Sequence, residues 1–113
     1  VAPYEARAAE IAVMNEVQVT LNDGQFAALC DFVYNVGAGN FSRSTLLVVI
    51  NAQEFEHVPT QLRRWVLAGG KEWPGLRTRR EREIELFFDG LPMPRALPRV
   101  PEDAGPIDVR TGE

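Results

Sequence analysis

The segment over residues 22–36 constrains the fold of this chain more than any other. Apolar residues recur there at helical spacing, at Phe26, Leu29, Cys30 and Val33. This spacing places an apolar stripe on one side of a helix. Asn22 precedes Gln25 by three residues, the spacing of a capping box in which both side chains satisfy backbone donors. The sequence therefore predicts a buried helix that begins after Asn22.

Further helical patterns cover most of the chain up to residue 88. Good helix formers around an apolar stripe predict a helix over 4–17, and serine caps predict one from Ser42 or Ser44 to Ile50. The β-branched residues of that second segment would also suit a short strand, but the serine caps and helical neighbours favour a helix. Gly37 and Gly39 should end the preceding helix, because glycine tolerates positive φ.

Two more helices are expected, with a glycine-rich loop between them. The first spans 54–66, or starts only at Val58, because Pro59 is tolerated only in a first turn. Residues 68–75 contain three glycines and Pro74, a composition that predicts a loop. The last helix spans 76–88, and one side of it carries Leu76, Arg80, Ile84 and Phe87. The fold class that these patterns predict is all-α.

The domain organisation follows from where the helical pattern stops. The 113 residues suffice for one domain, which we expect to comprise residues 1–90. Residues 91–113 contain five prolines, scattered charges and almost no aromatic side chains. Such a segment buries too little apolar area to offset the entropy lost on ordering. It is predicted to be a proline-rich, poorly ordered tail or linker.

Composition excludes some classes of protein and leaves the cellular compartment open. The formal net charge of −4 argues against a general polyanion binder, although seven of the twelve basic residues lie within 63–82. No apolar run approaches the roughly 18 to 20 residues of a membrane span, and the N-terminus does not resemble a secretion signal. Cys30 is the only cysteine, so an internal disulfide is excluded.

Two sequence blocks resemble a known family. They are FVYNVGAGNFSRSTLL over residues 32–47 and RRWVLAGGKEWPGLRTRRER over residues 63–82. In order and spacing they are similar to the C-terminal half of the phage-type lysozymes, the endolysin family, over about residues 20–88. The resemblance implies a lysozyme-like orthogonal helical bundle, the C-terminal lobe of that fold. It also implies a family activity, hydrolysis of the bond between N-acetylmuramic acid and N-acetylglucosamine in peptidoglycan, and glycan strands as the partner.

The first block contains a candidate sugar site. An aromatic ring, an amide and open glycine backbone at a helix end suit a saccharide, whose faces are apolar and whose rim is hydroxyl. The same residues would also serve as core and as a turn cap. The resemblance favours the groove, and it implies a glycan-binding set of Tyr34, Asn35, Gly37, Gly69, Gly70, Lys71 and Trp73. We assign Trp65 to the core, whereas for Trp73 both sugar stacking and packing stay open.

No catalytic residue is assigned in this chain. The resemblance implies that the family's catalytic Glu lies upstream of the matched region and is followed at fixed spacing by Asp or Cys and then Thr. Glu5, Glu10 and Glu16 have neither Asp nor Cys nine residues further on. Cleavage of a glycosidic bond needs an acid and a second group that holds or activates water. We therefore expect the chain to be inactive alone, and its first residue, Val1, leaves room for an upstream segment that was removed.

The remaining carboxylates are weak substitutes for the missing acid. Glu81 and Glu85 should be kept ionised by neighbouring arginines, whereas a general acid needs a raised pKa. Pairs of opposite charge four residues apart, Arg77 with Glu81 and Arg79 with Glu83, predict an ion-paired helix face. Glu72 stands between Lys71 and Trp73, which would shift its pKa in opposite directions.

We expect no metal site and no cofactor. His57 is the only histidine and is expected at the surface or as a helix cap, with no second His or Cys at ligand spacing.

The apolar residues of the first predicted helix indicate a protein partner besides glycan. Ile11, Met14 and Val17 would be left uncovered if the family's first lobe is missing, and they would then bury against a second copy. Three histories fit: an incomplete or cleaved endolysin, a degenerate relative that only binds peptidoglycan, and a subunit completed by another polypeptide. The alternative is a non-catalytic helical interaction module. Nucleic-acid binding through the arginine-rich last helix is disfavoured, because acidic residues interleave with the arginines.

Overall fold

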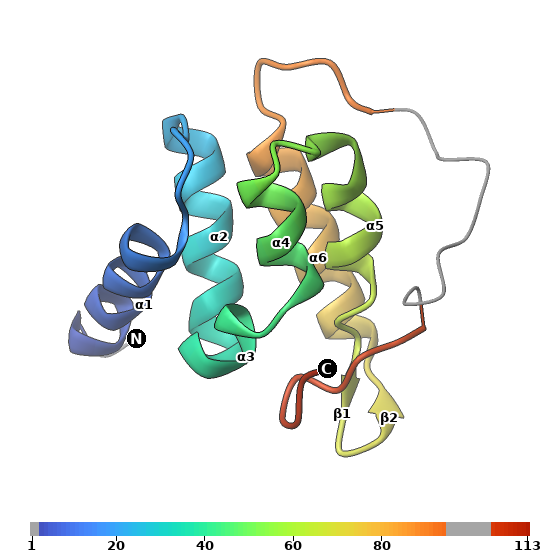
Figure 1. The fold of residues 1–113 in the computed structure, drawn as a ribbon. Helices are drawn as coiled ribbons and strands as arrows, with labels where there is room; N and C mark the ends of the chain where they lie inside the picture. Colours follow the sequence, from blue (N-terminus) through green and yellow to red (C-terminus); the bar gives the residue numbers. More distant parts are fainter. Residues whose placement is uncertain (1–2, 95–104) are drawn as a thin grey trace.

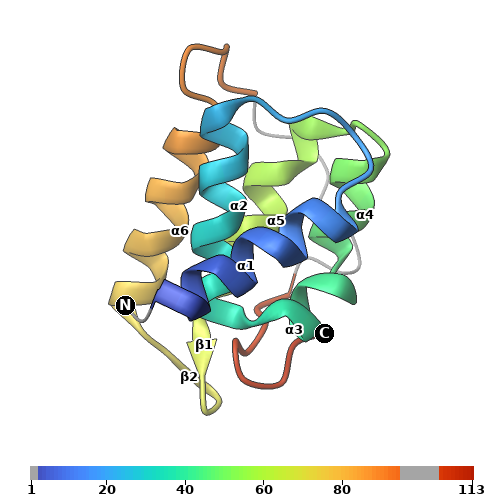
Figure 2. The same ribbon diagram turned by 90° about the vertical axis from the view of Figure 1, so that its left-hand side faces the viewer.

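The computed structural model describes residues 3–94 and 105–113 of the chain (Figure 1). In chain order its elements are α1 (Pro3–Glu16), α2 (Asp23–Val36), α3 (Ala38–Ser42), α4 (Thr45–Asn51), the 3-10 helix η1 (Phe55–His57), α5 (Val58–Arg63), β1 (Leu67–Ala68), β2 (Lys71–Glu72) and α6 (Pro74–Phe87). Helix α2 is central and packs against α1 and α6, while α5 packs against α6 and α4. Figure 2 shows α1 crossing obliquely over α2.

Local side-chain contacts set the ends of the helices, as the sequence predicts. At the start of α2 the Gln25 backbone N–H donates to Asn22 Oδ1 at 2.8 Å, and the Asn22 N–H donates to Gln25 Oε1 at 2.9 Å. The predicted capping box is therefore confirmed. Gly37 ends α2 at a φ of 93°, which a residue with a Cβ rarely adopts. Ser44, the second of the two predicted caps, accepts a hydrogen bond from the Leu47 N–H at 3.0 Å and begins α4.

Three local predictions need correction. Gly39 does not end a helix but lies inside the short helix α3, which follows Gly37 directly. The single helix expected over 54–66 is split into η1 and α5, and α5 starts at Val58 with Pro59 in its first turn. This is the later of the two predicted starts, and the reason is that a proline deeper in a helix removes a backbone donor. The third wrong prediction is the loop over 68–75, which includes residues of two short strands.

The loop expected over 68–75 contains a β-hairpin. Strands β1 and β2 pair antiparallel with Leu67 opposite Glu72 and Ala68 opposite Lys71. Gly69 and Gly70 form the turn at φ of 63° and 78°, and two successive positive φ values are what a two-residue type I′ hairpin requires. The fold is thus mostly helical, and the all-α prediction is wrong for these four paired residues.

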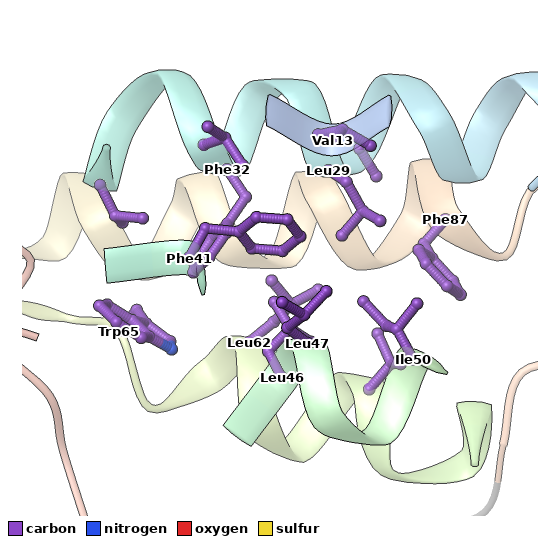
Figure 3. Packing of buried hydrophobic residues seen from close by; sticks show 14 of the residues in the cluster. Val13, Leu29, Phe32, Phe41, Leu46, Leu47, Ile50, Leu62, Trp65 and Phe87 are labelled. Carbon is purple, nitrogen blue, oxygen red and sulfur yellow. The ribbon is translucent and has the colours of Figure 1, made fainter. Parts of the chain in front are cut away.

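The apolar core joins all the helices. Figure 3 shows side chains from α1 to α6 pointing toward one another, among them Val13, Leu29, Phe41, Leu62 and Phe87. Trp65 has no exposed surface, so its assignment to the core is confirmed. Its ring meets Phe32 edge to face with centroids 5.2 Å apart. Burying each of these large side chains contributes roughly 1.5–3 kcal/mol to stability.

Residues 105–113, predicted to belong to a poorly ordered tail, instead pack on the domain. Ile107 is 4% exposed and belongs to the core. Its backbone N–H donates to the Arg64 carbonyl oxygen at 2.7 Å, and Leu67 N–H donates to the Ile107 carbonyl oxygen at 3.2 Å. Proline content suggested a tail, but an apolar side chain and the free edge of β1 offset the cost of ordering this stretch. Residues 95–104, the middle of the predicted tail, lie outside the described residues.

Helix α1 matches the helix predicted over 4–17 to within a residue at each end. Ile11 and Met14 are exposed on it, at 46% and 62% of their surface, whereas Val17 packs against the core. Val17 therefore does not extend the apolar surface as expected, because the chain turns there toward α2. Among residues 3–94 and 105–113, no helix combines the length and the apolar character needed to cross a membrane.

Candidate functional site

A pocket of about 460 Å³ lies at the C-terminal end of α2. Its lining residues are Ala8 and Ala9 of α1, Val33, Tyr34 and Asn35 of α2, Gly37, Ala38 and Arg79 of α6. Small side chains on α1 and around Gly37 leave the space open, and its volume falls within the roughly 300–1,000 Å³ of ligand sites. The structure thus brings together Tyr34, Asn35 and Gly37, three of the seven residues in the predicted glycan-binding set.

Arg79 borders the pocket with its charge already paired. It donates to both carboxylate oxygens of Asp31, from Nη2 at 3.0 Å and from Nε at 3.1 Å. Its guanidinium also lies over the Tyr34 ring, 6.0 Å from the centroid. This contact combines a cation with the negative face of an aromatic ring, and it helps to fix the position of the ring in the pocket wall.

Behind the pocket, Arg80 lies between α6 and α2 with no exposed surface. Its Nη2 donates to Asn35 Oδ1 at 2.6 Å and to Glu83 Oε2 at 3.2 Å. Its Nε is 2.9 Å from Glu83 Oε1, an ion-pair contact that lacks the alignment of a hydrogen bond. The Trp65 carbonyl oxygen accepts a further bond at 3.4 Å, and the Phe32 ring lies against the guanidinium. Asn35 is therefore tied to a buried charge.

The carboxyl groups of this cluster have pKa values shifted in opposite directions. Burial raises the pKa of Glu83 to about 9, and its hydrogen bond to Asp31 adds to the rise against the attraction of Arg80. Burial also acts to raise the pKa of Asp31, but hydrogen bonds from Glu83 and Arg79, with the charges of Arg79 and Arg80, lower it overall. Within the cluster, Glu83 is therefore the carboxyl group that favours the protonated form, and Asp31 is the one that favours the ionised form.

This buried cluster is not predicted from the sequence. The pairs Arg77–Glu81 and Arg79–Glu83 indicate a solvated, ion-paired helix face instead. One signal was present: Arg80 falls on the same side of α6 as Ile84 and Phe87, which is the side that the structure buries. An arginine at a core position requires buried partners, and Glu83 lies three residues further on.

The other four members of the predicted set lie on the β-hairpin and do not line this pocket. Gly70 uses its backbone N–H to bind Asp108 Oδ2 at 2.6 Å. Trp73 is 49% exposed, its Nε1 donates to the Ala68 carbonyl oxygen, and Lys71 Nζ lies over its ring. The hairpin projects from the same end of the molecule as α3 (Figures 1 and 2). A role for Gly69, Gly70, Lys71 and Trp73 in binding glycan stays a prediction.

Comparison with known proteins identifies the family. The family model described as phage lysozyme matches residues 4–83. This chain belongs to the phage lysozyme family. Among curated relatives, the SAR-endolysin of Bacteriophage PS119 is 54% identical over 74 residues, a region that covers 66% of this chain and 44% of the relative. The SAR-endolysin of Enterobacteria phage P21 is 50% identical over the same length, covering 66% of this chain and 45% of that protein. The chain thus spans somewhat less than half of these relatives.

Solved structures agree with the family assignment. The muramidase domain of SpmX from Asticaccaulis excentricus superposes with a TM-score of 0.69 at 28% identity, covering 74% of this chain and 60% of that one. A mutant of P22 lysozyme superposes with a TM-score of 0.67 at 31% identity, covering 74% of this chain and 57% of that one. The resemblance to phage-type lysozymes is therefore confirmed, and so is the lysozyme-like fold that it implies.

Two exposed acidic residues of this phage lysozyme family member, Glu72 and Glu81, are held in ion pairs. Glu81 bonds to Arg63, not to Arg77 as expected, with Arg63 Nε 2.8 Å from Glu81 Oε2. That hydrogen bond lowers the pKa of Glu81, against the effect of partial burial. Arg77 instead pairs with Glu72 at 2.5 Å. The expected pair of Arg79 with Glu83 is present at 3.7 Å. Arg79 and Arg80 thus contact the buried Glu83, whereas Arg63 and Arg77 pair with exposed carboxylates.

No described side chain outside the pocket offers an obvious second reactive centre. Within residues 3–94 and 105–113, no group of three or more His, Cys, Asp and Glu side chains could hold a metal ion. His57 ends η1 and stands at the start of α5, as expected, but its side chain makes no capping hydrogen bond there, so the capping role is not confirmed. Cys30 is half-buried, and burial raises the pKa of its thiol to about 11, so the nucleophilic thiolate is scarce at neutral pH.

Proposed function

We propose that this chain is the helical lobe of a peptidoglycan muramidase and that the pocket at the end of α2 binds glycan strands. The observation that carries the proposal is that Tyr34, Asn35 and Gly37 line one pocket in a member of the phage lysozyme family. The similarity to a muramidase domain supports the same substrate class. The parent activity would be hydrolysis of the bond between N-acetylmuramic acid and N-acetylglucosamine.

The chemistry of the pocket suits a sugar. The Tyr34 ring supplies an aromatic surface for the apolar face of a pyranose, and Asn35 supplies an amide for its polar rim. Gly37 lets a ligand approach the backbone, since no side chain stands there. Binding should nevertheless be weak, because a site on one lobe leaves much of each sugar in water.

We also propose that the 113-residue chain does not cleave glycan by itself. Near the pocket, Glu10 and Asp31 line a neighbouring hollow of about 250 Å³ that also borders Tyr34. Asp31 is paired with Arg79 and its pKa is lowered, so it is ionised and cannot donate a proton to a leaving group. Glu83 has the raised pKa of an acid, but its side chain is 1% exposed.

Cleavage needs an acid and a second group on opposite sides of one bond, and neither Asp31 nor Glu83 is suited to be that acid. Glu72, a further candidate, is exposed and paired with Arg77 on the hairpin. A lobe that carries the missing acid would complete the site.

A binding assay and a cell-wall clearing assay on the purified chain test both parts. The wild-type chain should bind purified peptidoglycan weakly and clear none. The double variant Tyr34→Ala with Asn35→Ala should lose binding, whereas Val48→Ala, an exposed change on α4, should keep it. Equal binding by the double variant and wild type would remove the proposed pocket. Clearing by wild type that disappears in Glu10→Gln or Glu72→Gln would overturn the proposal that the chain lacks catalysis.

The exposed apolar residues of α1 support a further part of the proposal. Ile11 and Met14 would be covered either by a missing N-terminal lobe or by a second copy of this chain. Sedimentation at increasing concentration separates the two. Self-association that Met14→Ser weakens would support the second copy, and a strict monomer would reject it.

A further inference from the structure

We infer that Arg80 is a positioning residue for the pocket: from inside the protein it fixes the Asn35 side chain so that the amide NH2 group faces the ligand. The inference rests on the proposed glycan site and adds which end of the amide a sugar would meet. Two observations carry it. Asn35 is one of the residues that line the pocket, and its side chain accepts a 2.6 Å hydrogen bond from a guanidinium that has no exposed surface.

The orientation follows from the chemistry of the two groups. A guanidinium carries only donors, so it can bind only the oxygen end of an amide. Asn35 must therefore turn Oδ1 toward Arg80, which leaves Nδ2 with its two hydrogens as the other polar end of the side chain. The amide of an unpaired asparagine could turn either its oxygen or its NH2 group toward a ligand. The amide of Asn35 can offer only its NH2 group, as a hydrogen-bond donor. The ligand atom that it recognises must be an acceptor, such as the N-acetyl carbonyl oxygen of an amino sugar.

The arginine itself is held on several sides. Glu83 and the Trp65 carbonyl oxygen bind its guanidinium, and the Phe32 ring packs against it at 5.0 Å. Because Arg80 is fully buried, water does not reach its guanidinium, and a charge-assisted bond such as the one to Asn35 is about twice as strong as a neutral one. The amide is thus held in place before the ligand arrives, which reduces the entropy lost on binding.

The polar contacts between α2 and α6 make this arrangement specific to the fold. Asp31 and Asn35 lie one turn apart on α2, and each meets an arginine of α6, Arg79 and Arg80 respectively. The two arginines have different tasks. Arg79 touches the pocket itself and packs over Tyr34, whereas Arg80 reaches the ligand only through Asn35.

The variant Asn35→Asp tests the inference directly. Aspartate keeps an oxygen for Arg80 but puts a second oxygen where the NH2 group was. Its melting temperature should equal or exceed that of the wild-type chain, because the bond to Arg80 becomes an ion pair. Affinity for glycan fragments released from purified peptidoglycan should fall at least tenfold. The exposed Asn15→Asp on α1 adds the same charge away from the pocket and should change neither quantity.

Two further measurements separate positioning from a structural role. Binding is measured in about 0.5 M salt, where repulsion between the added charge and an anionic fragment is screened. Side-chain amide NMR signals of Asn35 should shift when fragments are added to the wild-type chain. In Arg80→Lys, which keeps a positive charge beside Glu83 but loses the planar fork, these signals should move toward those of an exposed asparagine, with weaker binding.

The outcomes distinguish this inference from the proposed function. Full affinity in Asn35→Asp, with wild-type binding intact, would overturn the role of the NH2 group alone. Unchanged Asn35 signals in a folded Arg80→Lys would overturn the role of Arg80. If Arg80→Lys fails to fold, the Asn35 amide signals of the wild-type chain decide, because signals like those of an exposed asparagine would overturn the role of Arg80. No binding by the wild-type chain would reject the proposed function and this inference with it.

Discussion

The packing of the C-terminal segment gives the sharpest stability prediction. Ile107→Ala removes most of a side chain that is 4% exposed in the core, and such changes cost about 2–5 kcal/mol when the cavity stays open. In the variant, residues 105–113 can detach from the domain, which avoids a cavity. The loss of stability therefore cannot exceed the free energy with which this segment packs on the domain. We therefore expect a loss near the lower end, about 2 kcal/mol. For a domain of this size that lowers the melting temperature by roughly 10 °C.

Urea and thermal unfolding followed by circular dichroism measure this loss. Thr111→Ala is the matched control, because it is an exposed change in the same segment and should stay within about 0.5 kcal/mol of wild type. A chain that ends at residue 104 should resemble Ile107→Ala, since both lose the docked segment. Identical stability of Ile107→Ala and Thr111→Ala would refute the reasoning. It would mean that residues 105–113 contribute no packing, as the proline content of the sequence suggested.

Three other substitutions test a buried carboxyl group, a close contact between two helices and a helix cap. Glu83→Gln cannot titrate, whereas the folded wild-type chain keeps on Glu83 a proton that the unfolded chain releases above about pH 4.5. The free energy of unfolding of the wild-type chain should thus fall relative to that of the variant between about pH 4.5 and 9, by at most about 6 kcal/mol. Urea titrations at pH 5, 7 and 9 measure both free energies. A difference between them that stays constant over these three pH values would contradict the raised pKa of Glu83. Gly24→Ala places a Cβ 2.6 Å from the Leu86 carbonyl oxygen, so it should destabilise by more than 1 kcal/mol, unlike an ordinary glycine replacement in a helix. Asn22→Ala removes the cap of α2 and should cost about 1 kcal/mol in the same assay, and no change would show that Gln25 alone suffices.

The family match does not cover every residue that packs in the domain. The match covers residues 4–83, so residues 105–113 lie beyond it, yet they bind the hairpin through Asp108 and fill the core with Ile107. The chain also spans less than half of its curated relatives. The pocket at the end of α2 is therefore best tested on this chain alone and again with an added catalytic lobe.

The amino-acid sequence by itself determined the helices and their ends. The capping box of Asn22 and Gln25, the Ser44 cap and the glycine stop at Gly37 all act within a few residues, so their geometry depends on the local sequence. The sequence blocks also determined the family, and three residues of one block, Tyr34, Asn35 and Gly37, do line one pocket.

Only the tertiary structure decided which charges are buried and where the C-terminal segment lies. Asn35 and Arg80 are 45 residues apart, and nothing local tells an arginine on α6 that an amide on α2 will meet it. Ile107 likewise depends on a surface that distant residues form, because its backbone binds Arg64 at the end of α5 and Leu67 of β1. Burial of these groups depends on how helices pack, and packing depends on contacts between distant segments, which periodicity and composition do not encode.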